Sequence, residues 1–219
     1  MSTEYRIFYF PIRGLAEELR LFLEEKGITY TQEPLDPRDW FSVIKPTLAP
    51  LEQVPIVWHG DIKLRQSKAI LRYMARKHDG EGKNEREALQ ADIVVETTND
   101  WRQKFTSLCY TPGFESRKED YIRDTIPFYL KAFEYFLEEN GNTGYFAGDD
   151  FTYADVCVFD MVDNNILLDA NCLSKEKYPK LHQFYHNFKE RPRIAAYLKS
   201  DRRRKHCNGA IAHFDAYPW

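Results

Sequence analysis

The sequence predicts a small α/β domain followed by an all-helical domain. The first eighty residues alternate between strand-like and helix-like hydrophobic patterns, whereas only helical periods are found beyond them. Between the two regions the segment 78–87 (HDGEGKNERE) has two glycines, many charges and almost no apolar side chain, which is typical of a linker. With 219 residues the chain is long enough for two modest cores. We therefore predict domains at 1–80 and 88–219, joined by a linker at 81–87.

The first domain begins with a predicted strand and helix. Residues 6–10 (RIFYF) are aromatic and β-branched enough for a buried strand. Pro11 ends this strand because proline cannot donate to a strand ladder. Apolar residues at positions 15, 19, 22 and 23 then share one face of a helix. Gly27 is expected to end that helix as its C-terminal cap.

The remainder of the first domain is predicted to complete a mixed sheet. Residues 28–33 form a second strand, and an irregular, proline-rich stretch follows as far as Pro55. The short apolar pieces at 56–58 and 62–64 form a hairpin. Ser67 is then expected to cap a helix. The resulting order, βαβ followed by ββα, predicts a small sheet covered by helices.

The second domain shows helical periods throughout, most clearly at 86–109, 122–137 and 181–188. Thr152 and Asp155 form the pattern of a capping box, in which two side chains satisfy backbone N–H groups at the start of a helix. This capping-box pattern concerns folding and carries no information about chemistry.

Composition argues against several kinds of partner. The chain has 31 basic and 34 acidic residues, with a net charge of −3, so we expect no positive field for nucleic acid or an anionic membrane. No run of eighteen apolar residues occurs, and the polar first residues are not followed by an apolar region. This pattern predicts neither a membrane span nor a secretion signal. The four cysteines lack CxxC spacing, which favours a reducing, cytoplasmic compartment.

We also expect no metal site. His182 and His186 lie one turn apart on a predicted helix and could contact one ion, but no third ligand follows them. Packed or solvated histidines are the simpler interpretation.

Several motifs, spread over nearly the whole chain, resemble the cytosolic glutathione transferases that use a catalytic tyrosine. These are the segments 9–15 (YFPIRGL), 53–55 (QVP), 66–78 (QSKAILRYMARKH), 108–114 (LCYTPGF) and 151–155 (FTYAD). They occur in the family's order, and the chain is identified as a member of the mu/pi/sigma branch. The resemblance implies a thioredoxin-like N-terminal domain, reduced glutathione as co-substrate and a homodimer. It also implies conjugation of glutathione to small hydrophobic electrophiles, as in detoxification.

The resemblance assigns the catalytic role to Tyr9, at the end of the first strand. A free thiol with a pKa of about 8.5 is only about 3% thiolate at pH 7, and the thiolate is the nucleophile. A tyrosine hydroxyl that donates a hydrogen bond to the sulfur favours the ion, and lowering the thiol pKa by ~2 units corresponds to about 2.7 kcal/mol. One charge-assisted hydrogen bond plus local dipoles can supply this. Arg13 is expected to organise the turn after Tyr9 and the domain interface.

The resemblance also implies how glutathione is held. Pro55 would be cis, so that the backbone of Val54 pairs with the cysteinyl residue like a strand. The γ-glutamyl carboxylate would lie at the start of a helix, where N–H groups and the helix dipole suit an anion. The full set of glutathione-binding residues implied is Tyr9, Trp40, Lys45, Gln53, Val54, Pro55, Gln66, Ser67 and, from the other subunit of a dimer, Asp100.

At residues 51–52 the sequence departs from the family pattern. Leu51-Glu52-Gln53 replaces the usual aromatic-Gly-Gln. The resemblance implies that Trp40, Lys45 and Gln53 hold the glycyl carboxylate of glutathione. A carboxylate at Glu52 would place a like charge near that group and weaken binding.

The electrophile is expected to contact Phe10, Ile12, Tyr110 and the tail around Ile211 to Phe214. Tyr110 corresponds to a tyrosine that assists some substrates as an acid, and an apolar wall is the alternative. The tail 211–219 has no good counterpart in the family, and the sequence assigns no role to its end.

Two rival functions remain open. A glutathione-dependent isomerase, similar to prostaglandin D synthase, would share the glutathione site and differ in its hydrophobic pocket. A non-catalytic, crystallin-like or ligand-carrying protein would keep the fold without turnover, and the altered segment 51–52 is compatible with it. A peroxidase or thioltransferase that uses a cysteine is disfavoured, because no cysteine lies near the end of the first strand.

Overall fold

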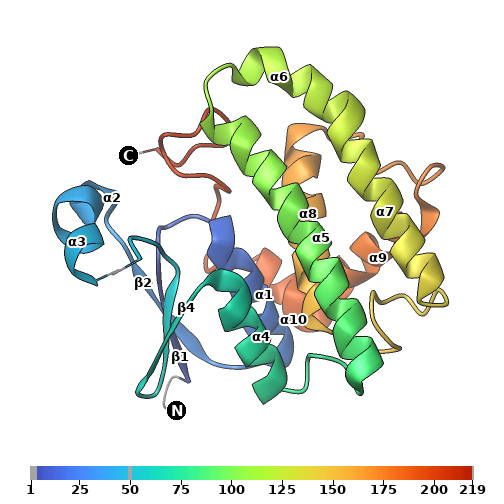
Figure 1. The fold of residues 1–219 in the computed structure, drawn as a ribbon, viewed down its shortest axis with the longest axis horizontal. Helices are drawn as coiled ribbons and strands as arrows, with labels where there is room; N and C mark the ends of the chain where they lie inside the picture. The colour runs from blue at the N-terminus through green and yellow to red at the C-terminus, as the bar shows by residue number, and fades with distance from the viewer. Residues whose placement is uncertain (1–3, 49–50, 219) are drawn as a thin grey trace.

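A computed structural model describes residues 4–48 and 51–218 and places a four-stranded sheet beside a set of long helices (Figure 1). The strand order is β2-β1-β3-β4; β1 is parallel to β2 and antiparallel to β3, and β3 is antiparallel to β4. The strands are β1 (Tyr5–Tyr9), β2 (Tyr30–Pro34), β3 (Ile56–His59) and β4 (Ile62–Arg65). Their ends lie within two residues of the predicted ones, and the predicted α/β fold class is confirmed.

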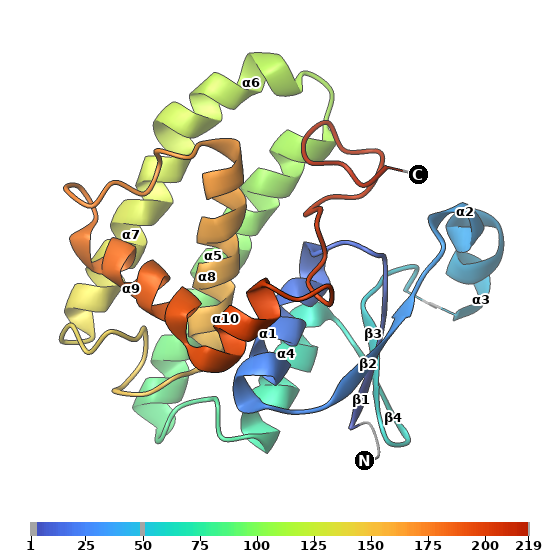
Figure 2. The ribbon, with the colours of Figure 1, turned by 180° about the vertical axis from the view of Figure 1, so that it is seen from behind.

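Two helices lie between this sheet and the rest of the molecule. They are α1 (Glu17–Lys26), which follows the short helix η1 (Gly14–Ala16), and α4 (Ser67–Lys77). The two views of Figures 1 and 2 agree on this placement. Gly27 ends α1 as predicted, because its φ of 68° allows its N–H to bond the carbonyl of Glu24 at 3.0 Å.

The segment between β2 and β3 was predicted to be irregular. That prediction holds for residues 35–36 and 51–55 and is wrong for residues 37–48, which are helical. The segment contains α2 (Pro37–Asp39), η2 (Trp40–Ile44) and α3 (Lys45–Leu48), and residues 49 and 50 lie outside the described part. The Asp36 carboxylate accepts the N–H of Arg38 at 2.9 Å and starts the first turn, where Pro37 is well tolerated. In Figure 1 the segment projects away from the helical domain.

The second domain is helical, as predicted. Its helices are α5 (Glu85–Tyr110), α6 (Phe114–Asp120), η3 (Tyr121–Thr125), α7 (Ile126–Glu139), α8 (Tyr153–Leu168), α9 (Pro179–Glu190) and α10 (Pro192–Leu198). Helix α8 is almost entirely buried and packs against α1, α4, α5 and α9. One apolar core therefore runs through both domains. Within the described residues, no helix is both long and apolar enough to cross a bilayer.

The connection between the domains is shorter than the polar segment suggested. Helix α5 begins at Glu85, inside the predicted linker, because the side chain of Asn84 accepts the N–H of Glu87 at 3.1 Å and caps it. The Glu87 carboxylate in turn accepts the N–H of Lys83 at 2.7 Å. The polar residues 85–87 are thus the exposed first turn of a helix, and the domain boundaries themselves stay a prediction.

The predicted capping box at the start of α8 is confirmed. The Asp155 carboxylate accepts the N–H of Thr152 at 2.7 Å and, from outside the helix, the N–H of Phe146 at 3.1 Å. Asp155 and Phe146 are fully buried. The carboxylate thus satisfies two backbone donors that no water can reach.

Replacing Asp155 by alanine is expected to lower the free energy of unfolding by about 2–4 kcal/mol, because two buried N–H groups lose their acceptor. Chemical denaturation measures this loss. The matched control is Asp149→Ala, which removes an exposed carboxylate paired with Lys83 and should leave the midpoint close to wild type. Equal midpoints for the two variants would contradict the structural role of Asp155.

Candidate active site

Tyr9 ends β1, and its side chain is buried with its hydroxyl at the following turn. The hydroxyl oxygen accepts the N–H of Leu15 at 2.9 Å. Since this bond uses a lone pair of the oxygen, the phenolic proton is available for another acceptor.

Burial raises the pKa of the Tyr9 phenol, while the Leu15 N–H and the charges of Arg20 and Arg102 act in the opposite direction. The net direction is upward. Tyr9 therefore keeps its proton at neutral pH, and its hydroxyl is able to donate a hydrogen bond.

The turn after Tyr9 depends on Gly14. Its φ is +44°, and a β-carbon at this position would lie 2.4 Å from the Tyr9 hydroxyl oxygen. Arg13 fixes the same turn: its guanidinium lies 3.2 Å from the Asp163 carboxylate of α8 and donates to the carbonyls of Arg204 and Lys205. The expected role of Arg13 at the domain interface is confirmed.

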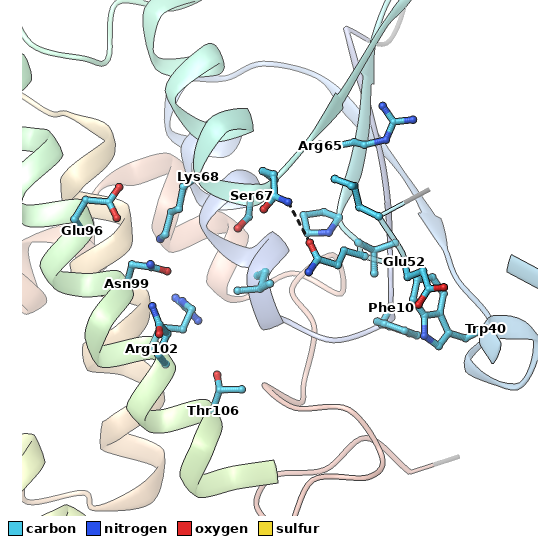
Figure 3. A pocket seen from close by; sticks show the side chains of 17 residues that line it. Phe10, Trp40, Glu52, Arg65, Ser67, Lys68, Glu96, Asn99, Arg102 and Thr106 are labelled. Atoms are coloured by element: carbon cyan, nitrogen blue, oxygen red, sulfur yellow. Dashed lines mark hydrogen bonds between the residues drawn. The ribbon is translucent and has the colours of Figure 1, made fainter. Parts of the chain in front are cut away.

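A cleft of about 840 Å³ lies between the first domain and α5. In Figure 3 its walls face each other, with Ser67 and Lys68 from the start of α4 on one side and Asn99, Arg102 and Thr106 from α5 on the other. Its lining comprises Phe10, Leu15, Trp40, Leu51, Glu52, Gln53, Val54, Pro55, Arg65, Gln66, Ser67, Lys68, Glu96, Asn99, Arg102, Gln103 and Thr106.

Six of the predicted glutathione-binding residues meet in this cleft: Trp40, Gln53, Val54, Pro55, Gln66 and Ser67. The Val54–Pro55 peptide bond is cis, which confirms the prediction made for it. The Gln66 amide donates to the Gln53 amide oxygen at 3.1 Å. This bond connects the segment before β3 to the start of α4.

Ser67 was predicted to cap α4, and that prediction is wrong. Ser67 is the first residue of the helix, and Gln66 occupies the cap position without a side-chain bond to the helix. Gln66 has φ +68° and ψ 107°, so the chain enters the helix one residue earlier than the serine signal suggested. Gln66, Ser67 and Lys68, at the start of α4, all line the cleft.

Three predicted glutathione residues lie outside the described lining of the cleft: Tyr9, which lines a neighbouring cavity, Lys45 and Asp100. Asp100 is exposed on α5. Lys45 lies beside Glu52, with 2.9 Å between its Nζ and the carboxylate. Glu52 itself has a φ of 55°, in the region that favours glycine.

A second, apolar cavity of about 240 Å³ adjoins the cleft, because Phe10 and Trp40 line both. Three predicted substrate residues, Phe10, Ile12 and Tyr110, line it together with Tyr9. The Tyr110 hydroxyl oxygen accepts the N–H of Gly209 at 2.6 Å, and burial raises its pKa to about 12. Tyr110 therefore also keeps its proton at neutral pH.

Known proteins resemble this chain over most of its length. The family models for the N-terminal and C-terminal domains of glutathione S-transferases match residues 6–76 and 99–201. Glutathione S-transferase 2 of Onchocerca volvulus is 37% identical over 196 residues, covering 89% of this chain and 92% of that protein. The chain belongs to the glutathione S-transferase family. Glutathione S-transferase Mu 1 of Mus musculus is 35% identical over 202 residues, covering 89% and 90% of the two chains.

Solved structures agree with this glutathione S-transferase assignment. The pi-class glutathione S-transferase of Onchocerca volvulus superposes with a TM-score of 0.88 at 35% identity, covering 96% of this chain and all of that one. Rat hPGDS in complex with a quinoline gives a TM-score of 0.78 at 29% identity, covering 89% and 95%. The fold and the family predicted from the sequence are confirmed.

The C-terminal tail of this glutathione S-transferase forms a closed loop. Asp215 accepts the N–H of Cys207 at 2.7 Å, and the Asn208 side chain donates to the carbonyl of Phe214 at 2.9 Å. In Figures 1 and 2 the tail lies between the C-terminal end of α5 and the segment α2–α3. Tyr217, which the sequence could not assign, lines the apolar cavity.

Phe214, predicted to contact the electrophile, is placed elsewhere. Its ring stacks on Phe114 at 5.8 Å and meets the edge of Phe105 at 6.2 Å. Among the described residues of the tail, Gly209, Ala210, Ile211 and Tyr217 are those that line the apolar cavity.

Helix α5 forms a polar wall of the cleft in this glutathione S-transferase, and this wall was not predicted from the sequence. The residues of the wall are Glu96, Asn99, Arg102, Gln103 and Thr106. Their spacing of three or four positions puts them on one face of a helix, and that polar face was the available signal.

Among residues 4–48 and 51–218, no group of three or more His, Cys, Asp or Glu side chains is placed to hold a metal ion. The rings of His182 and His186 lie 4.3 Å apart on α9.

Proposed function

We propose that this protein joins the sulfur of reduced glutathione to small hydrophobic electrophiles. The observation that carries the proposal is the position of the Tyr9 hydroxyl. Tyr9 lines the apolar cavity, while Leu15, whose N–H holds the hydroxyl, lines the polar cleft. A peptide thiol in the cleft and an apolar molecule in the cavity would therefore meet at a hydroxyl whose proton is free to be donated.

The polar cleft suits the tripeptide. The γ-glutamyl carboxylate would bind at Gln66 and Ser67, where the first N–H groups of α4 and the positive end of its dipole favour an anion. The backbone of Val54 would pair with the cysteinyl residue. Trp40 and Gln53 would hold the glycyl end, together with Lys45 once it separates from Glu52.

The reaction then needs few further groups. The Tyr9 O–H donates a hydrogen bond to the sulfur and favours the thiolate over the thiol. The thiol proton passes to solvent, the thiolate attacks the electrophilic carbon, a carbon–sulfur bond forms, and the leaving group departs with its electron pair. Tyr110, still protonated, can donate to an oxygen that gains charge on the electrophile. Holding both reactants in neighbouring cavities supplies the rest by proximity.

A homodimer is part of the proposal. Asp100 is exposed on α5 and lies outside the lining of the cleft, so its carboxylate would reach the γ-glutamyl ammonium of glutathione bound to another copy of the chain. Detoxification as the physiological role and a location in the cytoplasm stay predictions from the sequence.

The test is turnover of glutathione with 1-chloro-2,4-dinitrobenzene, followed by absorbance, with retention on immobilised glutathione as a separate measure of binding. Turnover together with retention supports the proposal. Retention without turnover moves the search to glutathione-dependent isomerisation or to a ligand-carrying role. The absence of both would overturn the glutathione site itself.

Glu52→Gly is expected to lower the KM for glutathione by about threefold to tenfold. The change releases Lys45 from a partner 2.9 Å away and removes a like charge near the glycyl carboxylate. It also puts glycine at a backbone φ of 55°. Initial rates over a range of glutathione concentrations give the KM.

Glu52→Gln is the matched variant, because it removes the charge and keeps the side-chain length. A similar fall of KM in both variants assigns the effect to charge, whereas a fall in the glycine variant alone assigns it to the backbone. An unchanged KM in both would show that Lys45 and Glu52 lie outside the glycyl subsite.

A further inference from the structure

Four charged side chains form a compact cluster at the floor of the cleft, which we call the floor cluster. It consists of Glu18 from α1, Lys68 from α4, Arg102 from α5 and Asp160 from α8. One Arg102 nitrogen, Nη2, lies 2.8 Å from Glu18 Oε1 and 2.6 Å from Asp160 Oδ2. Lys68 Nζ lies 2.6 and 2.7 Å from the two Glu18 oxygens. With all four ionised, the cluster has no net charge.

The floor cluster is shielded from water but opens into the site. Glu18 and Asp160 are fully buried, and the Arg102 side chain is 7% exposed. Lys68 and Arg102 nevertheless line the cleft, and Figure 3 shows them on its two facing walls. Screening by solvent is weak at such buried positions, so a change of one charge has a large effect on neighbouring ionisations.

Tyr9 lies in the electrostatic field of the floor cluster. After burial and the Leu15 N–H, the charges that act on Tyr9 are Arg20 and Arg102, which favour its anion, and Asp160, which disfavours it. A sulfur that accepts a hydrogen bond from Tyr9 would lie in this field as well. Arg102 and Asp160 therefore act on it with opposite signs.

We propose that Arg102 is an electrostatic residue of the reaction, whose charge favours the thiolate of glutathione bound beside Tyr9, and that Asp160 limits this effect. The inference rests on the proposed function. Arg102 acts on the sulfur through space, and Lys68 and Glu18 keep its guanidinium at the floor of the cleft.

Both carboxylates of the cluster are charged under assay conditions. Burial opposes the ionisation of Glu18, but Lys68 and Arg102 together lower its pKa to about 2. Burial raises the pKa of Asp160 to about 6, against the effect of Arg102. Above that pH the cluster is balanced, and removing either Arg102 or Asp160 changes its net charge by one unit in a known direction.

Other ionisable groups around the cluster stay the same in the variants described next. They are the Cys157 thiol, 3.6 Å from Lys68 Nζ, and a second set of ion pairs formed by Arg13, Glu17, Arg20, Asp163 and Arg203. This second set has three arginines and two carboxylates, and it adds a constant background.

The experiment compares Arg102→Gln, Asp160→Asn and the double variant by ultraviolet titration of the thiolate of bound glutathione and by the pH profile of kcat/KM above pH 6. Arg102→Gln should raise the thiol pKa, and Asp160→Asn should lower it, each by about half a pH unit to one unit. The double variant restores the net charge and should return close to wild type. Arg102→Lys should rescue most of the shift.

Lys104→Gln is the matched control, since it removes one positive charge from an exposed position on the same helix. It should leave the thiol pKa where it is. If Arg102→Gln does not fold, the thiol pKa of Asp160→Asn alone tests the inference, and it should be lower than in the wild type.

Shifts of opposite sign support the inference, because simple structural damage would move both variants in the same direction. Unchanged thiol pKa values, or shifts of the same sign in Arg102→Gln and Asp160→Asn, overturn it. A wild-type protein that binds no glutathione would instead overturn the proposed function, so the two failures are distinguishable.

Discussion

Tyr9→Phe is expected to lower kcat/KM for conjugation by about 25-fold at neutral pH, while binding to immobilised glutathione is retained. The phenylalanine ring fills the same space in the core but has no proton to donate to the sulfur. The thiol pKa should then return toward its ordinary value of about 8.5. The activity loss should consequently shrink as the assay pH rises above that value, where the free thiol ionises without help.

The pH profile is the decisive measurement for this variant. A rise of about two units in the pKa seen in kcat/KM supports the role of Tyr9. Tyr73→Phe is the matched control: it also loses a hydroxyl bond, the part-buried one to His59 at 2.7 Å, but it lies outside the lining of both cavities. A Tyr9→Phe profile identical to that of Tyr73→Phe would contradict the thiolate mechanism.

Gly14→Ala should reduce activity about as strongly as Tyr9→Phe, by about 25-fold, and should also lower the free energy of unfolding by about 1–2 kcal/mol. The new β-carbon would lie 2.4 Å from the Tyr9 hydroxyl oxygen, on a backbone with φ +44°. Either the tyrosine ring or the turn must move, and the bond from Leu15 would be lost. Conjugation kinetics and denaturation on one preparation measure both effects.

Gly60→Ala separates the two causes. Gly60 has a similar φ of +57°, but a β-carbon there would have no atom within 4 Å. This control should lose about 1 kcal/mol of stability and keep its activity. Equal activities in Gly14→Ala and Gly60→Ala would show that the position of the Tyr9 hydroxyl does not depend on Gly14.

The sequence predicted the ends of helices correctly where a single residue determines the local structure. Gly27 ends α1, and Asp155 caps α8, because each of these functions is fulfilled within a few residues of chain. Ser67 shows the limit of such single-residue signals: a good capping residue was present, yet Gln66 occupies the cap. The position of the cap is fixed by the path of the chain from β4, and the preference of single residues for cap positions does not describe that path.

The candidate site was predictable only in part, for a related reason. Motif residues such as Tyr9 and Pro55 lie in segments whose spacing is distinctive. Arg102 and Tyr217 come from distant parts of the chain, and only packing brings α5 and the tail to the cleft and the apolar cavity. Phe214 was misplaced because an aromatic side chain in a tail fits a substrate wall and a core equally well until its neighbours are known.

The single core that runs through both domains has a consequence for how the chain folds and is degraded. Helix α1 contacts α8 and α10 as well as α4, so separation of the two halves would expose its fully buried Glu17, Glu18 and Leu19 together. Exposing the apolar side chain and breaking the ion pairs of the two carboxylates would both be unfavourable. The halves should therefore unfold as one cooperative unit, and a fragment ending before α5 would persist in a cell only as a substrate for chaperones and proteases.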